Sequence, residues 1–393
     1  KGNPRRLQDL QGAVLITHPE NGELVAAVGS TQDFTGFNRA IDAKRQVGSL
    51  LKPVIYLTAL ESGRYTWASK VDDSPISIPM TGNQSWTPKN YSGRSYGEVP
   101  LVQALANSYN LSAVRLGQEF GVSSFSNHLI KFGVTSPIPS YPSIFLGAVD
   151  MSPMEVMNIY GNFATGGFKY PVKSIRSVVD SNGRSLDRYN LNVQQTIDPT
   201  AAYQLNYGMQ QVMSSGTGRS AYNTFSPQLK LAGKSGTTND TRDSWFAGYS
   251  GNYTTVVWLG LDDNKVTGLT GSSGALPVWI NVMKQLRQKP VNLKQTDDIQ
   301  WHWIDVASGE LSAQGCEGAL FIPITRFHVP TRATPCGFPH YQVQSDYIPG
   351  DENDPSQDGA NDSLGNYIRE SERNMEQDFS DAPQRTPSSN NQF

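Results

Sequence analysis

Short apolar runs separated by turns occur at both ends of the chain. Residues 13–17 and 24–28 are β-favouring runs on either side of Glu20-Asn21-Gly22. An Asn-Gly pair between two such runs predicts a β-hairpin. Three more runs of this kind follow later, at residues 229–232, 244–249 and 254–261. Together the five segments predict a five-stranded antiparallel sheet.

The stretch between these two groups of strands is mainly helical. We expect helices over residues 102–118, 124–132 and 153–164, and one more that begins near Ser49. Pro53 suits that start, because its missing N–H is not needed in the first turn of a helix. The apolar residues of this helix leave almost no polar face: Leu50, Leu51, Val54, Ile55, Leu57 and Leu60. It is therefore expected in the core of an α/β sandwich whose terminal strands pair in one sheet.

The start of the buried helix also carries candidate chemistry. Ser49 and Lys52 are three positions apart, so they share a helix face and the amine can reach back to the hydroxyl. A neutral lysine can take the proton of a serine nucleophile. A lone Ser-x-x-Lys is common, however, and is more often part of a helix cap.

Two further motifs follow in a fixed order, Ser108-Tyr109-Asn110 and then Lys234-Ser235-Gly236-Thr237. Taken alone, each could be an ordinary turn. A phosphate-binding loop at the third motif is excluded, because its first glycine would have to stand at position 228, which is Gln228. The ordered triple S-x-x-K, S-x-N and K-[ST]-G is the signature of penicillin-binding proteins and class A β-lactamases.

With these motifs, residues 11 to about 340 resemble the transpeptidase domain of the class A, bifunctional penicillin-binding proteins of Gram-negative bacteria, most closely the 1b type. Ser235 stands where many members have threonine, and Tyr109 fills the variable middle of the second motif. Neither departure removes a functional group. The resemblance extends to residues 37–40, 45–49, 146–148, 151–155, 216–218 and 245–249. It implies a penicillin-binding, serine β-lactamase-like fold.

The resemblance also implies the role of each motif residue. Ser49 would be the nucleophile, Lys52 its base, and Ser108 a proton relay to the leaving amine. Burial and the second cation, Lys234, would lower the pKa of Lys52. Substrate binding would fall to Asn110, which would hold an amide, and to Lys234, Ser235, Gly236 and Thr237 on the strand. Of these, Lys234, Ser235 and Thr237 would bind the donor carboxylate, and Gly236 would leave the strand face clear for a peptide.

The backbone N–H groups of Ser49 and Thr237 would form the oxyanion hole. The activity so implied is that of a peptidoglycan D,D-transpeptidase. The D-Ala-D-Ala end of one stem peptide would be the donor, an amine of a neighbouring stem peptide would be the acceptor, and β-lactam antibiotics would be covalent inhibitors. No cofactor is expected.

The C-terminal part of the chain has a different composition. Residues 301–305 and 320–322 predict a small β appendage within residues 296–344, after a transpeptidase domain at 11–295 and a linker at 1–10. We expect a disulfide between Cys316 and Cys336, the two cysteines of the sequence, in an oxidising compartment. From Asp346 onward, eleven Asp and Glu stand against three Arg, a net −8, which leaves +5 for residues 1–345. Residues 345–393 are too polar to order themselves and are expected to be an acidic, disordered tail.

Composition narrows the function classes further. Only 17% of the residues are charged and the formal net charge is −3, so nothing suggests a nucleic-acid partner. The five histidines show no metal-ligand spacing, and no apolar run reaches 18 residues. Because the chain begins at Lys1, we expect an excised piece of a longer protein. The resemblance implies that the full-length protein carries a glycosyltransferase domain and an inner-membrane anchor, with the catalytic part on the periplasmic face.

Other hypotheses share part of this chemistry. A β-lactamase needs a base for deacylation, a glutamate with an asparagine four positions on, whereas Glu155 is followed by Asn158 at three. A penicillin sensor would acylate and stay acylated, and a D,D-carboxypeptidase would hydrolyse the same acyl-enzyme. A Ser-His-Asp hydrolase fits poorly, because no serine lies in a strand-to-helix elbow: Gly93-Arg94-Ser95-Tyr96-Gly97 has the G-x-S-x-G spacing but falls outside the predicted strands and helices.

Overall fold

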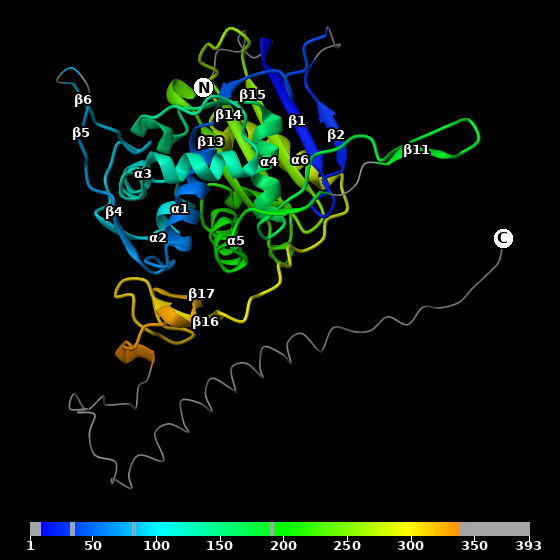
Figure 1. Ribbon diagram of the computed structural model, residues 1–393. Coiled ribbons are helices and arrows are strands. Elements are labelled where there is room, and N and C mark those ends of the chain that lie inside the picture. Colours follow the sequence, from blue (N-terminus) through cyan, green and yellow to red (C-terminus); the bar gives the residue numbers. More distant parts are fainter. Residues whose placement is uncertain (1–8, 32–35, 81, 83, 189–191, 338–393) are drawn as a thin grey trace, which may run out of the picture. The chain divides into compact units, whose positions relative to one another are not determined.

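A five-stranded antiparallel sheet forms the frame of the protein. The computed structural model describes residues 9–31, 36–80, 82, 84–188 and 192–337. The strands lie in the order β13-β14-β15-β1-β2 (Figure 1). Their bounds are β1 Gln11–Thr17, β2 Leu24–Val28, β13 Ala232–Thr237, β14 Ser244–Tyr249 and β15 Thr254–Gly260. Strand β1 pairs with β15 from Gln11↔Gly260 to Thr17↔Thr254. The first and the last of these strands in the sequence are therefore neighbours within one sheet, as predicted.

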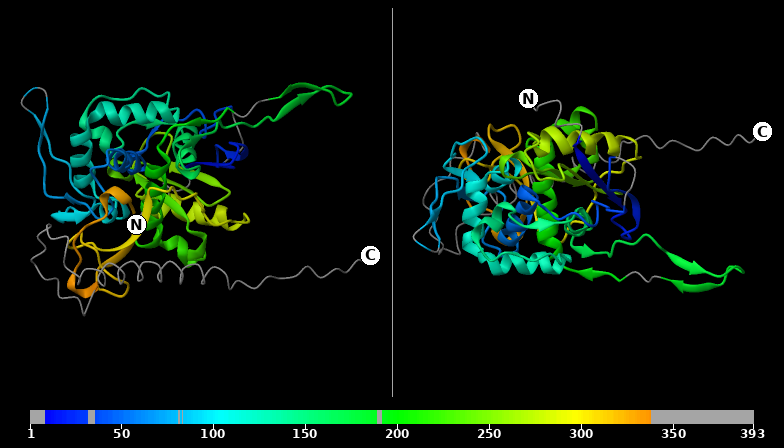
Figure 2. Two further views of the ribbon diagram at one scale, coloured as in Figure 1. Left: turned by 60° about the horizontal axis from the view of Figure 1, so that its bottom comes forward. Right: turned by 90° about the horizontal axis from the view of Figure 1, so that it is seen from above.

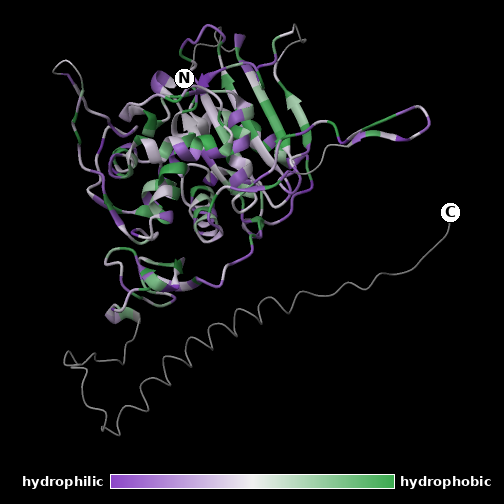
Figure 3. Cartoon of the chain, viewed as in Figure 1, coloured by the Kyte–Doolittle hydropathy of each residue, from purple (hydrophilic) through white to green (hydrophobic). Residues whose placement is uncertain are grey.

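Helices cover both faces of the sheet. Their bounds are α1 Lys52–Glu61, α2 Leu101–Ala106, α3 Asn110–Phe132, α4 Pro153–Ala164, α5 Pro199–Ser214 and α6 Leu276–Lys284. Along β14, Trp245 and Ala247 join the core that contains α1, α4 and α5, whereas Phe246 joins a second core with Trp279 of α6. This alternation follows from the period of two along a strand. Hydrophobic residues accordingly gather in the sheet and its flanking helices, while the loops are mostly hydrophilic (Figure 3).

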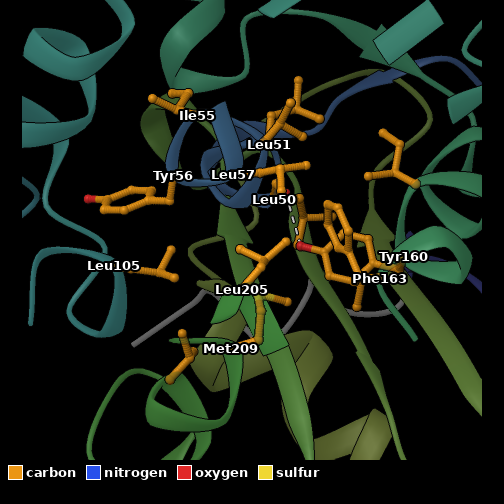
Figure 4. Close-up of a cluster of buried hydrophobic side chains, with 14 of the residues drawn as sticks. Leu50, Leu51, Ile55, Tyr56, Leu57, Leu105, Tyr160, Phe163, Leu205 and Met209 are labelled. Atoms are coloured by element: carbon orange, nitrogen blue, oxygen red, sulfur yellow. Dashed lines mark hydrogen bonds between the residues drawn. The ribbon is translucent and has the colours of Figure 1, made fainter. Parts of the chain in front are cut away.

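Helix α1 occupies the centre of the larger core. All of its residues from Lys52 to Leu60 are buried. Figure 4 shows Leu50, Leu51 and Leu57 among Tyr160 and Phe163, with Leu205 and Met209 nearby. The Tyr160 hydroxyl donates a hydrogen bond of 2.9 Å to the carbonyl oxygen of Leu50. The prediction of a helix buried on all sides is therefore confirmed.

Two predicted elements were wrong. The helix expected over 102–118 breaks at residues 107–109, between α2 and α3, and α3 is itself kinked at Gly121. The strand expected over 229–232 begins only at Ala232, because the 3-10 turn Pro227–Leu229 precedes it and Lys230 has a left-handed backbone with φ +48°. In both places a polar residue with a left-handed backbone, Ser108 or Lys230, interrupts the expected element, and a single such residue does not reveal its backbone conformation in the sequence.

Short strands outside the main sheet form five two-stranded sheets in the described residues. The two-residue to four-residue strands are β3 Arg45–Gln46, β4 Lys70–Asp72, β5 Ile78–Pro79, β6 Ser85–Trp86, β7 Glu98–Pro100, β8 Asp150–Met151, β9 Phe168–Lys169, β10 Ser177–Val179, β11 Ser185–Arg188 and β12 Gln194–Gln195. They pair as β3·β8, β4·β7, β5·β6, β9·β12 and β10·β11. The β10·β11 hairpin projects from the body in both views of Figure 2. None of the helices in the described ranges is long and apolar enough to cross a membrane.

A separate two-stranded sheet follows the main one. Strands β16 (Ile299–Asp305) and β17 (Ala319–Thr325) pair antiparallel in register from Ile299↔Thr325 to Asp305↔Ala319. Trp301 packs edge-on against Tyr207 of α5, with ring centroids 5.6 Å apart. A disulfide joins Cys316 to Cys336, whose Cα atoms are 5.9 Å apart.

The boundaries at 295 and 344 stay predictions. Residues 1–8 of the expected linker, residues 338–344 of the expected appendage and the whole expected tail, 345–393, lie outside the described residues.

The disulfide should stabilise the region after β16. Closing a loop with a sequence separation of 20 restricts the unfolded chain, which is worth roughly 3 kcal/mol in the chain-entropy account. We expect a Cys316→Ser, Cys336→Ser variant to lose β16·β17 at a lower denaturant concentration than wild type, as followed by hydrogen exchange of the amide groups of β16 and β17. A reducing agent should reproduce the loss in wild type and change nothing in the variant. Equal midpoints for both proteins would show that the disulfide adds no stability.

Candidate active site

The first motif lies where the chain enters the core. Gly48–Leu51 form a 3-10 turn, and α1 continues from Lys52 with Pro53 in its first turn. Ser49 is half-buried in the turn, whereas Lys52 is fully buried. One short segment therefore presents a hydroxyl to the surface and an amine to the interior.

The second motif occupies the break between α2 and α3. Ser108 has φ +60°, a left-handed conformation that a residue with a side chain seldom adopts. The helix resumes at Asn110. Strain of this kind persists only where the surroundings hold it, and it is typical of functional sites. Here it makes Ser108 a turn residue, with its side chain directed at the two lysines of the other motifs.

The third motif lies on β13, at the edge of the sheet. Lys234 is fully buried and Ser235 nearly so. The N–H of Thr238 donates to the carbonyl oxygen of Asp243, the residue before β14, and the register pairs Thr237 with Ser244. Hydrogen-bonded and non-hydrogen-bonded pairs alternate in an antiparallel ladder. The N–H and C=O of Thr237 therefore point away from β14, to the open edge of the sheet.

The three motifs meet at the hydroxyl of Ser108. Lys234 Nζ donates to Ser108 Oγ at 2.8 Å, and Lys52 Nζ lies 3.2 Å from the same oxygen. Lys52 Nζ also donates to Asn110 Oδ1 at 2.6 Å and to the carbonyl oxygens of Ser108 and Tyr109 at 2.6 and 3.1 Å. One hydroxyl is thus held between two buried amines that come from a helix and a strand far apart in the sequence.

Burial shifts both lysines toward their neutral forms. Burial, and next the charge of Lys234, lowers the pKa of Lys52 well below its ordinary value, while the Asp73 carboxylate acts in the opposite direction. Burial lowers the pKa of Lys234 to about 7. Burial is the main cause for both lysines, because a cation out of water is costly. For Lys52 the second cation, Lys234, adds to that cost. A neutral amine, able to accept a proton, is therefore accessible at this site near neutral pH.

The direct contact that we expected between Lys52 and Ser49 is not formed. Within the described part of the chain the Ser49 hydroxyl makes no hydrogen bond, and Lys52 instead binds four oxygens of residues 108–110. The buried amine is satisfied by the second motif, which leaves the partly exposed hydroxyl of Ser49 open to an incoming group.

Two glycines let the first and third motifs approach each other. A Cβ on Gly236 would lie 2.7 Å from the carbonyl oxygen of Val47 and 2.8 Å from Leu50 Cγ. A Cβ on Gly48, whose φ is +55°, would lie 2.5 Å from the carbonyl oxygen of Thr237. Gly236 therefore makes room for the chain's own nucleophile segment, not for a peptide as the sequence suggested. The same contact brings the backbone of residues 48–49 beside that of Thr237.

Hydroxyl groups line the neighbouring side of β13. Ser235 Oγ donates to Thr217 Oγ1 at 2.8 Å, and the N–H of Gly271 donates to Thr237 Oγ1 at 2.9 Å. Ser272 Oγ donates to the carbonyl oxygen of Thr217. The 216–218 turn, quoted above only for its resemblance, thus contributes a hydroxyl to the site. The hydroxyls of Ser235, Thr217 and Thr237, with Lys234 on the same strand, suit an anionic group such as a carboxylate.

Glu155 serves a structural purpose. Its carboxylate accepts from Ser152 in a capping box, from the N–H groups of Thr135 and Ser136, and from Lys44 Nζ at 2.6 Å. Burial raises the pKa of Glu155, but these hydrogen bonds outweigh burial and leave the pKa below its ordinary value. A carboxylate bound in this way is a poor base for activating water.

Sequence patterns missed two side chains that support the second motif. Asp73 and Asn90 are buried and contact the start of α3. Neither belongs to a motif, and single buried polar residues in loops give no periodic signal. The described residues include no cluster of three or more His, Cys, Asp or Glu that could hold a metal ion.

Comparison with known proteins identifies the family of this chain. A family model described as the penicillin binding protein transpeptidase domain matches residues 12–284. The chain belongs to this family. Penicillin-binding protein 1B of Vibrio cholerae serotype O1 is 39% identical over 321 residues, which cover 81% of this chain and 41% of that protein. Penicillin-binding protein 1B of Escherichia coli K12 is 37% identical over 300 residues, 75% of this chain and 35% of that protein.

A solved structure agrees with these sequence comparisons. The crystal structure of penicillin-binding protein 1A from Haemophilus influenzae has a TM-score of 0.77 and 28% identity, and the match covers 83% of this chain and 55% of that chain. The family, the 1b resemblance and the penicillin-binding fold expected from the sequence are therefore confirmed. The chain spans less than half the length of these two relatives.

The buried Lys234 should make stability rise with pH. Its pKa is about 7 in the folded protein against an ordinary 10.5, so between these values the unfolded chain binds a proton that the folded protein does not. Linkage then requires the free energy of unfolding to increase as pH rises through this window. We expect this increase to be smaller in a Lys234→Met variant, as measured by denaturant unfolding at matched pH. Lys284→Met, on the exposed end of α6, should follow wild type, and a wild-type slope in Lys234→Met would refute the assignment.

Proposed function

We propose that this chain is a serine-type D-Ala-D-Ala transpeptidase that cross-links peptidoglycan stem peptides. The observation that carries the proposal is the meeting of two buried lysines at the Ser108 hydroxyl, next to a partly exposed serine on the SxxK turn. The family model and the two relatives named penicillin-binding protein 1B support the same activity.

In the first half-reaction Ser49 is acylated. Its Oγ attacks the carbonyl carbon of the peptide bond between the two D-alanines of the donor, and its proton passes to neutral Lys52. The C–N bond of the tetrahedral intermediate then breaks. The leaving D-alanine takes up a proton through the Ser108 hydroxyl, and the donor remains on Ser49 as an ester.

In the second half-reaction an amine of a neighbouring stem peptide attacks this ester. The amine loses a proton to the same basic groups, the C–O bond breaks, and Ser49 recovers its hydroxyl. The product is a new amide that joins two stem peptides. No cofactor enters either step.

The remaining site residues would bind and polarise the donor. Asn110 would hold its amide, and Lys234, Ser235 and Thr237 would take its terminal carboxylate. The N–H of Thr237, which faces the open sheet edge, and that of Ser49 would stabilise the negative oxygen of the tetrahedral intermediate, a stabilisation often worth several kcal/mol. The close contact of Gly48 with Thr237 supports this pairing.

A β-lactamase is less favoured. The carboxylate that would have to activate water, Glu155, accepts hydrogen bonds from Ser136, Ser152 and Lys44 and is held in its charged form by them. An acyl-enzyme without such a base should be long-lived. A sensor or carboxypeptidase would form the same acyl-enzyme, so turnover of a peptide donor with an added amine separates them from a transpeptidase.

We also propose a setting for this activity. The chain would act on the periplasmic face of the bacterial inner membrane, linked in the full-length protein to a glycosyltransferase domain and a membrane anchor. Support comes from the resemblance to the class A proteins and from the 41% share of the Vibrio cholerae relative that the chain spans.

A penicillin should add covalently, once, to Ser49. The β-lactam amide replaces the scissile peptide bond, and the acyl-enzyme lacks a bound base for hydrolysis. Intact mass should increase by the mass of one penicillin, and peptide mapping should place the adduct on residue 49. Ser49→Ala should show no increase. An adduct on another serine would overturn the proposed nucleophile, and an adduct that is lost within seconds would favour a β-lactamase.

The two lysines should differ in their effect on acylation. We expect Lys52→Ala to reduce the penicillin acylation rate by roughly 10² to 10⁴, the usual loss when a general base is removed. Lys234→Ala should instead raise the penicillin concentration needed for half-maximal rate, because it removes a carboxylate-binding group. Lys284→Ala on α6 is the control for loss of a lysine. Equal and mild defects in the two site variants would contradict these roles.

A further inference from the structure

Asp73 is a fully buried carboxylate that belongs to none of the three motifs. It lies just after β4 and accepts four hydrogen bonds. Its Oδ1 accepts from the N–H of Ser112 at 3.0 Å and from the Ser112 hydroxyl at 2.8 Å, while Oδ2 accepts from Asn90 Nδ2 at 2.5 Å and from the N–H of Tyr96 at 3.2 Å. Burying a carboxylate costs free energy unless its oxygens accept hydrogen bonds, and here both oxygens of Asp73 accept two.

Asn90 extends this network to the second motif. Its Oδ1 accepts from the N–H of Asn110 at 2.6 Å and from that of Leu111 at 3.3 Å. With the Asp73 contact to Ser112, the first three N–H groups of α3 are therefore satisfied by two side chains from another part of the chain. The helix needs them, because its own N-cap residue, Tyr109, offers no side-chain cap. A carboxylate at this end also interacts favourably with the helix dipole.

The capped helix start determines where Asn110 and Lys52 lie. Asn110 Oδ1 accepts from Lys52 Nζ at 2.6 Å, and Asn110 Nδ2 donates to the carbonyl oxygen of Lys89, one residue before Asn90. The Tyr96 ring, from the same loop, stacks on Tyr109 with centroids 4.3 Å apart. The loop of residues 89–96 and the second motif are thus bound to each other at both ends of the loop, through Lys89 and through Tyr96.

Asp73 also balances charge in this interior. In the described part of the chain, the charged groups that act on Lys52 are Lys234, from β13, and Asp73, from the loop after β4. Lys234 disfavours the ammonium form of Lys52 and Asp73 favours it. Asp73 therefore opposes the effect of Lys234 on Lys52.

We propose that Asp73 is a positioning residue of the active site: it fixes the start of α3 through Ser112 and Asn90, and it sets the charge balance around Lys52. The inference rests on the proposed transpeptidase function, because its effect is read through acylation of Ser49.

The test compares penicillin acylation rates of wild type, Asp73→Asn and Asp72→Asn across the acidic and neutral pH range. In Asp73→Asn the new amide opposes the N–H donors of Asn90 and Tyr96, so Asn110 loses its support, and the maximal rate should fall on the order of 10- to 100-fold. Loss of the negative charge should lower the pKa of Lys52, so the neutral base forms at lower pH and the acidic limb of the rate profile should move to lower pH.

Asp72→Asn is the matched control. It removes a carboxylate one residue away, which forms a partly exposed ion pair with Arg115, a residue further along α3, at 2.9 Å. The N–H groups at the start of α3 bond to Asn90 and Asp73 instead. We expect its rate and pH profile to follow wild type. A purely structural role for Asp73 would lower the amount of folded protein without moving the pH profile of the folded fraction.

Asn90→Ala keeps the inference testable if Asp73→Asn does not fold. It removes the cap on Asn110 without changing the charge, so the maximal rate should fall while the acidic limb stays in place. The swapped pair Asp73→Asn, Asn90→Asp restores one donor facing one acceptor, and it should recover part of the rate. Wild-type rates in both Asp73→Asn and Asn90→Ala would overturn the inference. A wild-type protein that takes up no penicillin would overturn it together with the proposed function.

Discussion

Two lysines buried on either side of one serine hydroxyl are the feature on which the rest of the structure depends. Removing an ammonium group from water costs several kcal/mol even after relaxation. The protein accommodates Lys52 and Lys234 by surrounding them with oxygens of residues 108–110 and 235. The oxygens of residues 108–110 are available because the helical stretch is broken at Ser108, where the carbonyl groups of Ser108 and Tyr109 turn toward Lys52.

Close backbone packing brings the three motifs to this point. Gly48 and Gly236 leave no side chain between the SxxK turn and the edge strand, and Gly147 does the same on the far side, where a Cβ would overlap the carbonyl oxygen of Gly48. The SxxK turn is therefore packed between β13 and the loop before α4. Such contacts permit little adjustment, which suits a site that must hold donor groups at fixed positions.

For the proposed transpeptidase, the arrangement accounts for a long-lived acyl-enzyme. The two amines that could accept a proton, Lys52 and Lys234, both contact the Ser108 hydroxyl. Glu155, the carboxylate considered as a base for water, is instead held by hydrogen bonds that stabilise α4 and the 135–136 loop. In the proposed reaction, the site would therefore activate an acceptor amine with the groups around Ser108 and would lack a carboxylate to activate water.

The sequence by itself determined the elements whose signal is local. The hairpin of β1 and β2, strand β14 and helix α4 lie where the pattern of apolar residues predicted them, and Pro153 after Ser152 marks the start of α4. The three motifs also predicted that Lys52, Ser108 and Lys234 belong to one site, and the three side chains are in contact. Only the tertiary structure decided that the chain breaks at Ser108, that β13 begins at Ala232, and that Asp73 and Asn90 support α3, because each depends on partners far away in the chain. The lowered pKa values of the lysines belong to the same class, since burial and a neighbouring charge exist only once the chain has folded.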